Sequence, residues 1–280
     1  MKQTNFTVLL SSLILSACAL SPSKPLSPEE VKANLEERYR REYTEAATHT
    51  ITLKGQEIKV IDRLYRPENY RAGHHAYGTP SESDLVVIQR SDTVGATALT
   101  ALVAIARTFG GGGSISGFSK HDLRGNVAEP KFPNPVFSYL SPKIRTWLVG
   151  MPIQGEVHTR NNIYVQPGRF YLVYEKLSGG DNYLLHNEIQ LVVSPDGWGG
   201  LVDPDFSCIK ETGAHSLEDW RKDDYALVRQ TAEQQFDECL EQFKANQDQI
   251  IEHITRGNDH TSDHVDSDDK EENNHERAKN

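Results

Sequence analysis

The stretch THTITLKGQEIKVIDRLY, residues 48–65, decides the fold class. Apolar and polar side chains alternate on both sides of its centre, which is the pattern of strands with one buried face. Gly55-Gln56 is read as a two-residue turn, so the stretch predicts a β-hairpin. The predicted cross-strand pairs are Ile51 with Val60 and Leu53 with Ile58.

Further strands are predicted along the chain. Residues 85–88, with the sequence LVVI, form a short apolar strand, and residues 155–165, 169–176 and 188–193 are the other predicted strands. Pro167-Gly168 is predicted to turn the chain between two of them. The segment PNPVFSYLSPK carries prolines at 133, 135 and 142 and is predicted to be irregular.

An N-terminal helix is predicted to begin after Ser27. Ser27 is a suitable cap, Pro28 fits the first helical position, and Glu30 completes a capping box. Apolar side chains then recur every four residues, which predicts a narrow stripe and a helix on the surface of a sheet. The stripe consists of Val31, Leu35, Tyr39 and Tyr43.

The strongest helical pattern lies near the C-terminus. Ser216 is the predicted cap, with Asp219 three residues later. Apolar residues follow at spacings of three and four, which places them on one buried face. They are Tyr225, Val228, Ala232, Phe236, Cys239 and Phe243.

A further helix is predicted over residues 94–106, where only Thr97 and Thr100 are polar and most side chains are small. It is either a core helix or a helix that packs on a partner or in a membrane. Its length of roughly 20 Å is less than the 30 Å of a bilayer core.

Together these patterns predict an α+β fold. A mainly antiparallel sheet or sandwich packs with an N-terminal helix, the small-residue helix and the long C-terminal helix. We expect a single domain over residues 28–257, preceded by a tether at 18–27. Residues 258–280 hold eight acidic and three basic side chains and almost no apolar ones, so they predict a disordered acidic tail.

The first residues carry a targeting signal. Lys2 is followed by an apolar run that is too short to span a bilayer and ends in Leu15-Ser16-Ala17-Cys18. These four residues resemble the lipobox of bacterial lipoproteins. The resemblance implies that residues 1–17 are a signal peptide and that Cys18 is acylated, which anchors the protein in the bilayer. Ala19, where Asp would favour the inner membrane, implies the outer membrane. The alternative is an ordinary secretory signal with an incidental cysteine.

Only two cysteines remain, Cys208 and Cys239. In an oxidising compartment they are predicted to form a disulfide, worth roughly 3–4 kcal/mol in the chain-entropy model. It would pin the C-terminal helix to a loop predicted around Cys208. The alternative is two unpaired buried thiols.

Several other motifs are weak. Gly112, Gly117 and Ser119 nearly form a phosphate-binding loop, but Phe118 stands where lysine is required, so we expect no nucleotide. His74 and His75 have no acidic partner at a suitable spacing, and the tail binds ions loosely at most, so no metal and no cofactor are expected. The formal net charge of −10 argues against nucleic-acid binding.

These observations favour a non-enzymatic component of the bacterial envelope that binds a partner protein or takes part in assembly. We expect it at the outer membrane, anchored through Cys18, with its domain facing the periplasm. One alternative is an envelope hydrolase with a dispersed active site, since catalytic side chains meet only in three dimensions. Another is an oligomer that assembles through the helix at residues 94–106.

Overall fold

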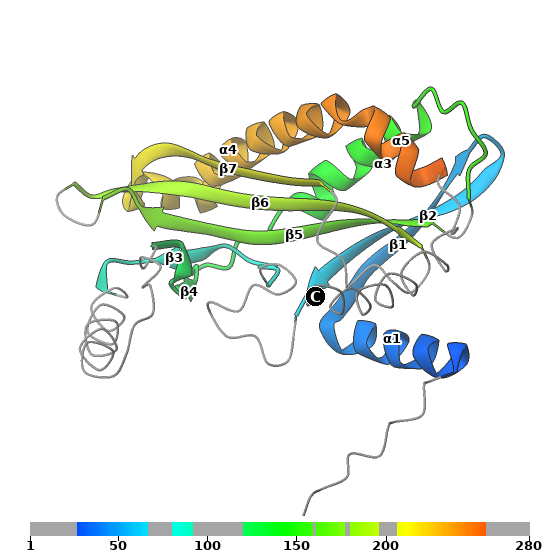
Figure 1. Cartoon of the computed structure of the whole chain (residues 1–280). Coiled ribbons are helices and arrows are strands. Elements are labelled where there is room, and N and C mark those ends of the chain that lie inside the picture. Colours follow the sequence, from blue (N-terminus) through cyan, green and yellow to red (C-terminus); the bar gives the residue numbers. More distant parts are fainter. Residues whose placement is uncertain are drawn as a thin grey trace, which may run out of the picture.

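The computed structural model describes residues 27–66, 80–91, 120–158, 161–176, 180–195 and 206–255. It has the predicted α+β architecture, with a mainly antiparallel sheet and a long C-terminal helix (Figure 1). The helical elements are α1 (Pro28–Glu42), the 3₁₀ helix η1 (Lys120–Asp122), the π-helix η2 (Val136–Leu140), α3 (Ser141–Val149), α4 (Leu217–Ala245) and α5 (Gln247–Thr255). The strands are β1 (Tyr43–Leu53), β2 (Gln56–Tyr65), β3 (Val86–Ile88), β4 (Asn126–Val127), β5 (Asn161–Tyr174), β6 (Asn182–Pro195) and β7 (Phe206–Ser216).

Strand β5 is the centre of the seven-stranded sheet that the described residues form. On one side, its first half pairs in parallel with β2 and its second half pairs in parallel with β3. On the other side it pairs antiparallel with β6, which in turn pairs with β7. The β1–β2 hairpin and the β3–β4 pair therefore share one edge of β5.

The predicted hairpin of β1 and β2 forms, but in a different register. Its turn residues are Lys54 and Gly55, with φ of +48° and +80°, and Ile51 pairs with Ile58 rather than with Val60. A two-residue turn with positive φ at both positions matches the twist of the strands and favours glycine second. Both registers place the same side chains on the buried face, so alternation alone does not distinguish them.

Strand β5 continues through Pro167-Gly168, where a turn was predicted. The prediction was wrong because these residues form a β-bulge, where the register against β6 shifts by one residue before Phe170. A bulge accommodates a proline, which has no amide hydrogen for the ladder. The extra residue also reverses the alternation of the strand. Gln166 and Tyr171, an odd number of residues apart, therefore lie on the same face of the sheet.

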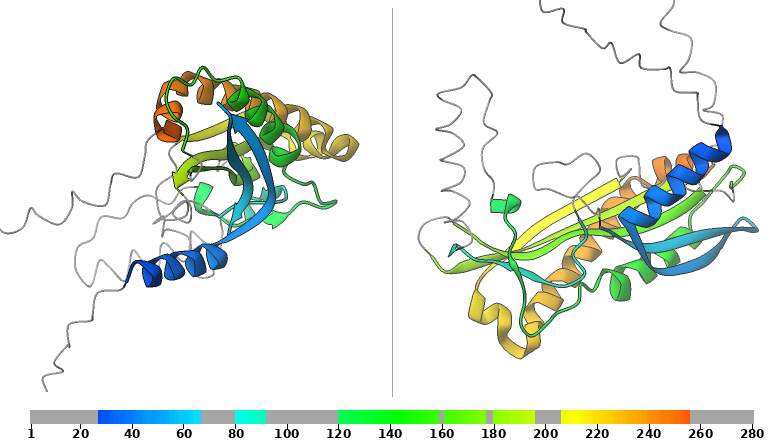
Figure 2. Two further views of the ribbon diagram at one scale, coloured as in Figure 1. Left: turned by 90° about the vertical axis from the view of Figure 1, so that its right-hand side faces the viewer. Right: turned by 90° about the horizontal axis from the view of Figure 1, so that it is seen from below.

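Two layers of side chains pack on the sheet. Helices α3, α4 and α5 cover one face, and α1 lies on the other side (Figures 1 and 2). The main core lies under the three helices and includes Phe170, Leu185, Ile189, Phe236 and Phe243. We call the other face, which carries Tyr171, His186 and Glu211, the opposite face.

Both predicted helix starts are present. Ser27 and Glu30 form the capping box of α1, and the Asp219 amide donates to the Ser216 hydroxyl at the start of α4. The six apolar side chains predicted to line α4 are all buried. The helix is interrupted, however, because Lys222 is extended and the next three residues have positive φ. The indole of Trp220, just before this break, donates to the Tyr183 carbonyl and is fully buried.

Two other segments differ from the prediction. Residues 133–143 were expected to be irregular, but most of them belong to η2 and to the start of α3. Pro142 stands in the first turn of α3, where its missing amide hydrogen costs nothing. The loop expected around Cys208 is strand β7, and its short alternating pattern was not recognised. The predicted tether up to residue 26, the helix at 94–106 and the acidic tail lie outside the described residues. Among the described helices, none combines the length and the apolar character that crossing a bilayer requires.

Candidate functional site

A row of polar side chains crosses the opposite face of the sheet. Tyr171 of β5 pairs with His186 of β6, and His186 pairs with Glu211 of β7. The β5 bulge makes this row possible, because without its extra residue Tyr171 would point under the helices. Three adjacent strands thus present a phenol, an imidazole and a carboxylate side by side.

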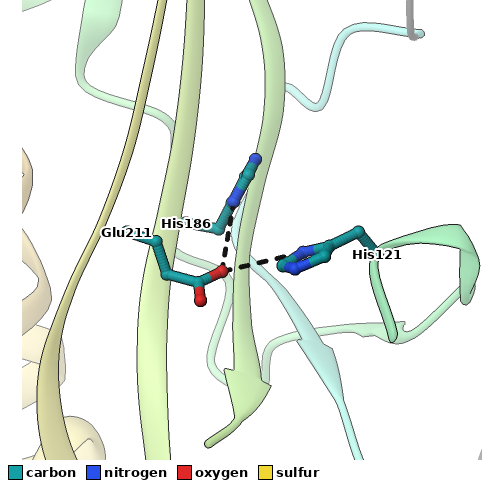
Figure 3. Close-up of side chains that lie close together, drawn as sticks. All are labelled: His121, His186 and Glu211. Carbon is teal, nitrogen blue, oxygen red and sulfur yellow. Dashed lines mark hydrogen bonds and ion pairs between the residues drawn. The ribbon is translucent and has the colours of Figure 1, made fainter. Parts of the chain in front are cut away.

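The short helix η1 adds His121 to this row. Arg169, which lies in the β5 bulge, holds η1 in place by donating to the main-chain carbonyls of His121 and Leu123 at 2.6 and 3.0 Å. Glu82 in turn accepts from the Arg169 Nε at 3.1 Å and from the Phe170 amide at 2.6 Å. The loop that carries His121 is therefore fixed to the sheet through main-chain atoms, and its imidazole points toward Glu211 (Figure 3).

The side chains of the cluster are close together. Oε2 of Glu211 lies 3.4 Å from Nδ1 of His186 and 3.6 Å from Nδ1 of His121 (Figure 3). The Tyr171 hydroxyl lies 2.7 Å from the same nitrogen of His121. The Tyr171 and His186 rings stack with their centroids 4.5 Å apart, which fixes the plane of the His186 imidazole.

Lys120 and burial set the charges in the cluster. Lys120 Nζ donates to Oε1 of Glu211 at 3.1 Å. Burial of Glu211 favours the neutral acid, but its hydrogen bonds with His186 and Lys120 and the nearby positive charge outweigh burial and lower its pKa to about 2. Burial lowers the pKa of His121, against the attraction of Glu211, and raises the pKa of the Tyr171 phenol. At neutral pH the cluster therefore offers an ionised carboxylate beside a neutral His121 imidazole.

A second feature is a shallow groove on the outer side of the helices. Two adjoining hollows, of about 950 and 480 Å³, lie along α4 and α3 and share Lys143, Leu240 and Lys244. The rest of the lining is Tyr139, Pro142, Thr146, Trp147, Gly150, Gln230, Glu233, Gln234, Asp237, Glu238 and Glu241. Asp237 accepts from Lys143 at 2.6 Å and from the Tyr139 hydroxyl at 2.9 Å, which ties the two walls together.

A serine, a histidine and an aspartate also meet, at Ser141, His49 and Asp62. The Ser141 hydroxyl donates to Asp62 at 2.6 Å, and His49 lies on the other carboxylate oxygen at 3.4 Å. The carboxylate therefore stands between the hydroxyl and the imidazole, whereas a catalytic triad needs the imidazole next to the hydroxyl. Ser141 is also fully buried. This trio is a structural link between β2 and α3 and offers no activated nucleophile.

The predicted disulfide partners come together. Cys208 of β7 and Cys239 of α4 lie at disulfide distance, with their Sγ atoms 2.03 Å apart, on the helix-covered face. Cys18, His74, His75 and the acidic residues of the tail lie outside the described residues.

Sequence reasoning did not identify His121, His186 and Glu211. They come from three elements far apart in the chain, and no local motif joins them. The one available signal is in β6, where His186, Glu188 and Gln190 are polar at every second position on a strand that lies between two others. Such alternation on an inner strand indicates a polar face, but it does not name the partners.

Comparisons with known proteins identify no relative. No protein-family model, no curated protein and no solved structure matches this chain. The interpretation of its function therefore depends on its own residues.

Proposed function

We propose that this protein is a lipid-anchored component of the bacterial envelope that binds a partner protein and has no catalytic role of its own. The anchor is acylated Cys18 at the outer membrane, with the domain facing the periplasm. The sequence Leu15-Ser16-Ala17-Cys18 supports this location. The observation that carries the binding role is the groove along α3 and α4.

The groove has the character of a surface for a polypeptide. It is wide and open, so a small molecule in it would keep much of its surface in water, whereas small-molecule sites bury most of their ligand. Its lining combines partly buried rings, Tyr139 and Trp147, with Leu240 and with charged side chains along the rim. Aromatic anchors within a polar rim are typical of protein–protein interfaces.

The charge of the groove indicates the chemistry of its partner. The larger hollow is lined by four acidic side chains, of Glu233, Asp237, Glu238 and Glu241, but by only two lysines. A partner segment that combines apolar side chains with lysine or arginine would match both the apolar floor and the acidic rim.

Site-specific photo-crosslinking in intact cells tests this proposal. A photoreactive amino acid replaces Thr146 or Gln234, two exposed groove residues. The control position is Glu57, an exposed residue of β2 next to the hairpin turn. We expect both groove positions to give the same crosslinked partner and Glu57 to give none. Trp147→Ala should reduce the yield from both groove positions. Equal crosslinking from Glu57, or none from the groove, would contradict the proposal.

A further inference from the structure

We propose that His121, His186 and Glu211 form a binding site for a divalent transition-metal ion of the zinc class. The site lies on the opposite face of the sheet, away from the groove along α3 and α4, and does not depend on the role of that groove. Within the described part of the chain, these three residues are the group whose ligand atoms converge, all lying within 4.8 Å of one another.

Two of the three separations between the ligand atoms fit tetrahedral coordination. Zinc binds nitrogen and oxygen ligands at about 2.0–2.1 Å, so two ligands of a tetrahedral site are about 3.3 Å apart. The separations from Oε2 of Glu211 to the two imidazole nitrogens are 3.4 and 3.6 Å. Neighbouring ligands of an octahedral ion at similar bond lengths are only about 3.0 Å apart. These two separations are closer to the tetrahedral value than to the octahedral one. The two imidazole ligand atoms lie within 4.8 Å of each other and would draw together on a zinc ion.

The donor types exclude other common cations. Two imidazoles and one carboxylate suit zinc and related transition metals, whereas calcium and magnesium take oxygen ligands. Three protein ligands leave a fourth position for water or an anion. The Tyr171 hydroxyl lies 2.7 Å from His121 Nδ1, so metal binding at that nitrogen would displace it.

The surroundings orient the ligands before any ion binds. Stacking on Tyr171 fixes the ring plane of His186, and Lys120 holds the second oxygen of Glu211. Arg169 fixes the backbone that carries His121. Contacts between the ligating side chains and their neighbouring residues set the geometry and affinity of metal sites.

Lys120 also limits the affinity, because its ammonium places a positive charge near the bound cation. A site of moderate affinity with one open position is suited to an ion that enters and leaves.

Zinc titration of the purified full-length chain in detergent tests the site, with calorimetry for stoichiometry and affinity. The tail carries three histidines that could bind zinc by themselves, so the reference chain carries His260→Ala, His264→Ala and His275→Ala. We expect this chain to bind one zinc ion, and to take up cobalt with the intense visible absorption typical of four-coordinate cobalt.

Variants in that reference chain then identify the ligands. Glu211→Gln and His121→Ala should each weaken zinc binding by at least about tenfold. His158→Ala, a histidine outside the cluster, should leave it unchanged. His121 is 38% exposed, so its variant tests the site even if Glu211→Gln fails to fold. Absence of binding, loss of binding with the tail histidines, or full affinity in both ligand variants would overturn the proposal.

Discussion

Arg169 donates a hydrogen bond of 2.6 Å to the main-chain carbonyl of His121, and this bond joins the β5 bulge to η1. The same guanidinium reaches the Leu123 carbonyl and Glu82, so one side chain fixes two segments that are distant in the sequence. Arginine can donate to all three acceptors at once because its donors are spread over the three nitrogens of a planar group. Lysine carries all its donors on one nitrogen and cannot reach acceptors that lie this far apart.

Arg169→Lys should therefore lower the free energy of unfolding by about 2–3 kcal/mol, since at least one carbonyl and part of the Glu82 contact lose a charged donor. Urea denaturation measures the change. Arg40→Lys is the control, because Arg40 is 74% exposed and its pairing with Glu36 contributes little. Equal stability of the two variants would show that Arg169 does not clamp η1.

Gly213→Ala should be strongly destabilising for two separate reasons. Gly213 has φ of +79°, which costs a residue with a Cβ about 1–2 kcal/mol. Its Cβ would also lie 2.8 Å from a ring carbon of Trp220, a fully buried side chain that cannot easily move. Gly55→Ala has nearly the same φ, +80°, with nothing within 4 Å of the new Cβ. Thermal unfolding of both variants separates the two costs, and equal losses would argue against the collision.

Glu82 should make stability depend on pH. Burial, against the attraction of Arg169, raises its pKa from 4.5 to about 7. The folded protein then binds the proton more tightly than the unfolded chain, so the contribution of Glu82 to stability falls as the pH rises from about 4.5 to 7. The full change is at most about 3 kcal/mol.

Glu82→Gln removes this titrating group. The difference in stability between wild type and variant therefore reports the titration of Glu82 alone. Relative to wild type, the variant should become more stable between pH 4.5 and 8, by up to about 3 kcal/mol. Urea midpoints across that range measure the difference. A relative stability that falls with pH would mean that the contacts with Arg169 and the Phe170 amide outweigh burial.

Cys208→Ser should lower the free energy of unfolding by roughly 2–4 kcal/mol, because the unfolded chain loses a covalent constraint. Cys239 would stay buried on α4 and react slowly with thiol reagents. Alkylation of native and denatured wild type, with and without reductant, checks the pairing itself. Two thiols that label on denaturation without reductant would show that the bridge is absent.

Cys18→Ser should release the protein from the membrane, because the thioether to the lipid cannot form. Detergent partitioning and mass spectrometry compare the variant with wild type, which should carry an acyl mass on Cys18. The double variant Cys208→Ser/Cys239→Ser is the control and should remain anchored. Unchanged membrane retention of Cys18→Ser, with no acyl mass on wild type, would rule out the lipid anchor.

The sequence predicts those elements whose signal is local. The capping box at Ser27 and the apolar stripe of α4 depend on residues within a few turns of one another, and both are present. The hairpin was predicted in the wrong register because both registers bury the same side chains, and the turn geometry at Lys54 and Gly55 decides between them.

The candidate metal site depends on information that is not local. Its histidines become neighbours only through the order of β5, β6 and β7 and through the arginine that fixes η1. Pro167-Gly168 has the composition of a turn, and nothing in the neighbouring residues shows that the chain continues as a strand. If Pro167-Gly168 is taken as a turn, Tyr171 is not placed beside its partner His186. The sequence alone therefore does not predict the site.

From the central position of β5 we also expect a definite order of folding. Its parallel partners, β2 and β3, come early in the chain, whereas β6 and β7 follow it directly. Contacts between distant segments form slowly because a long loop must close first, while antiparallel neighbours can pair quickly. The unit of β5, β6, β7 and α4 should therefore fold first, and β2 and β3 should join it later. Cys208 and Cys239 both lie in this early unit, so the disulfide between them does not restrict the later pairing of β2 and β3 with β5.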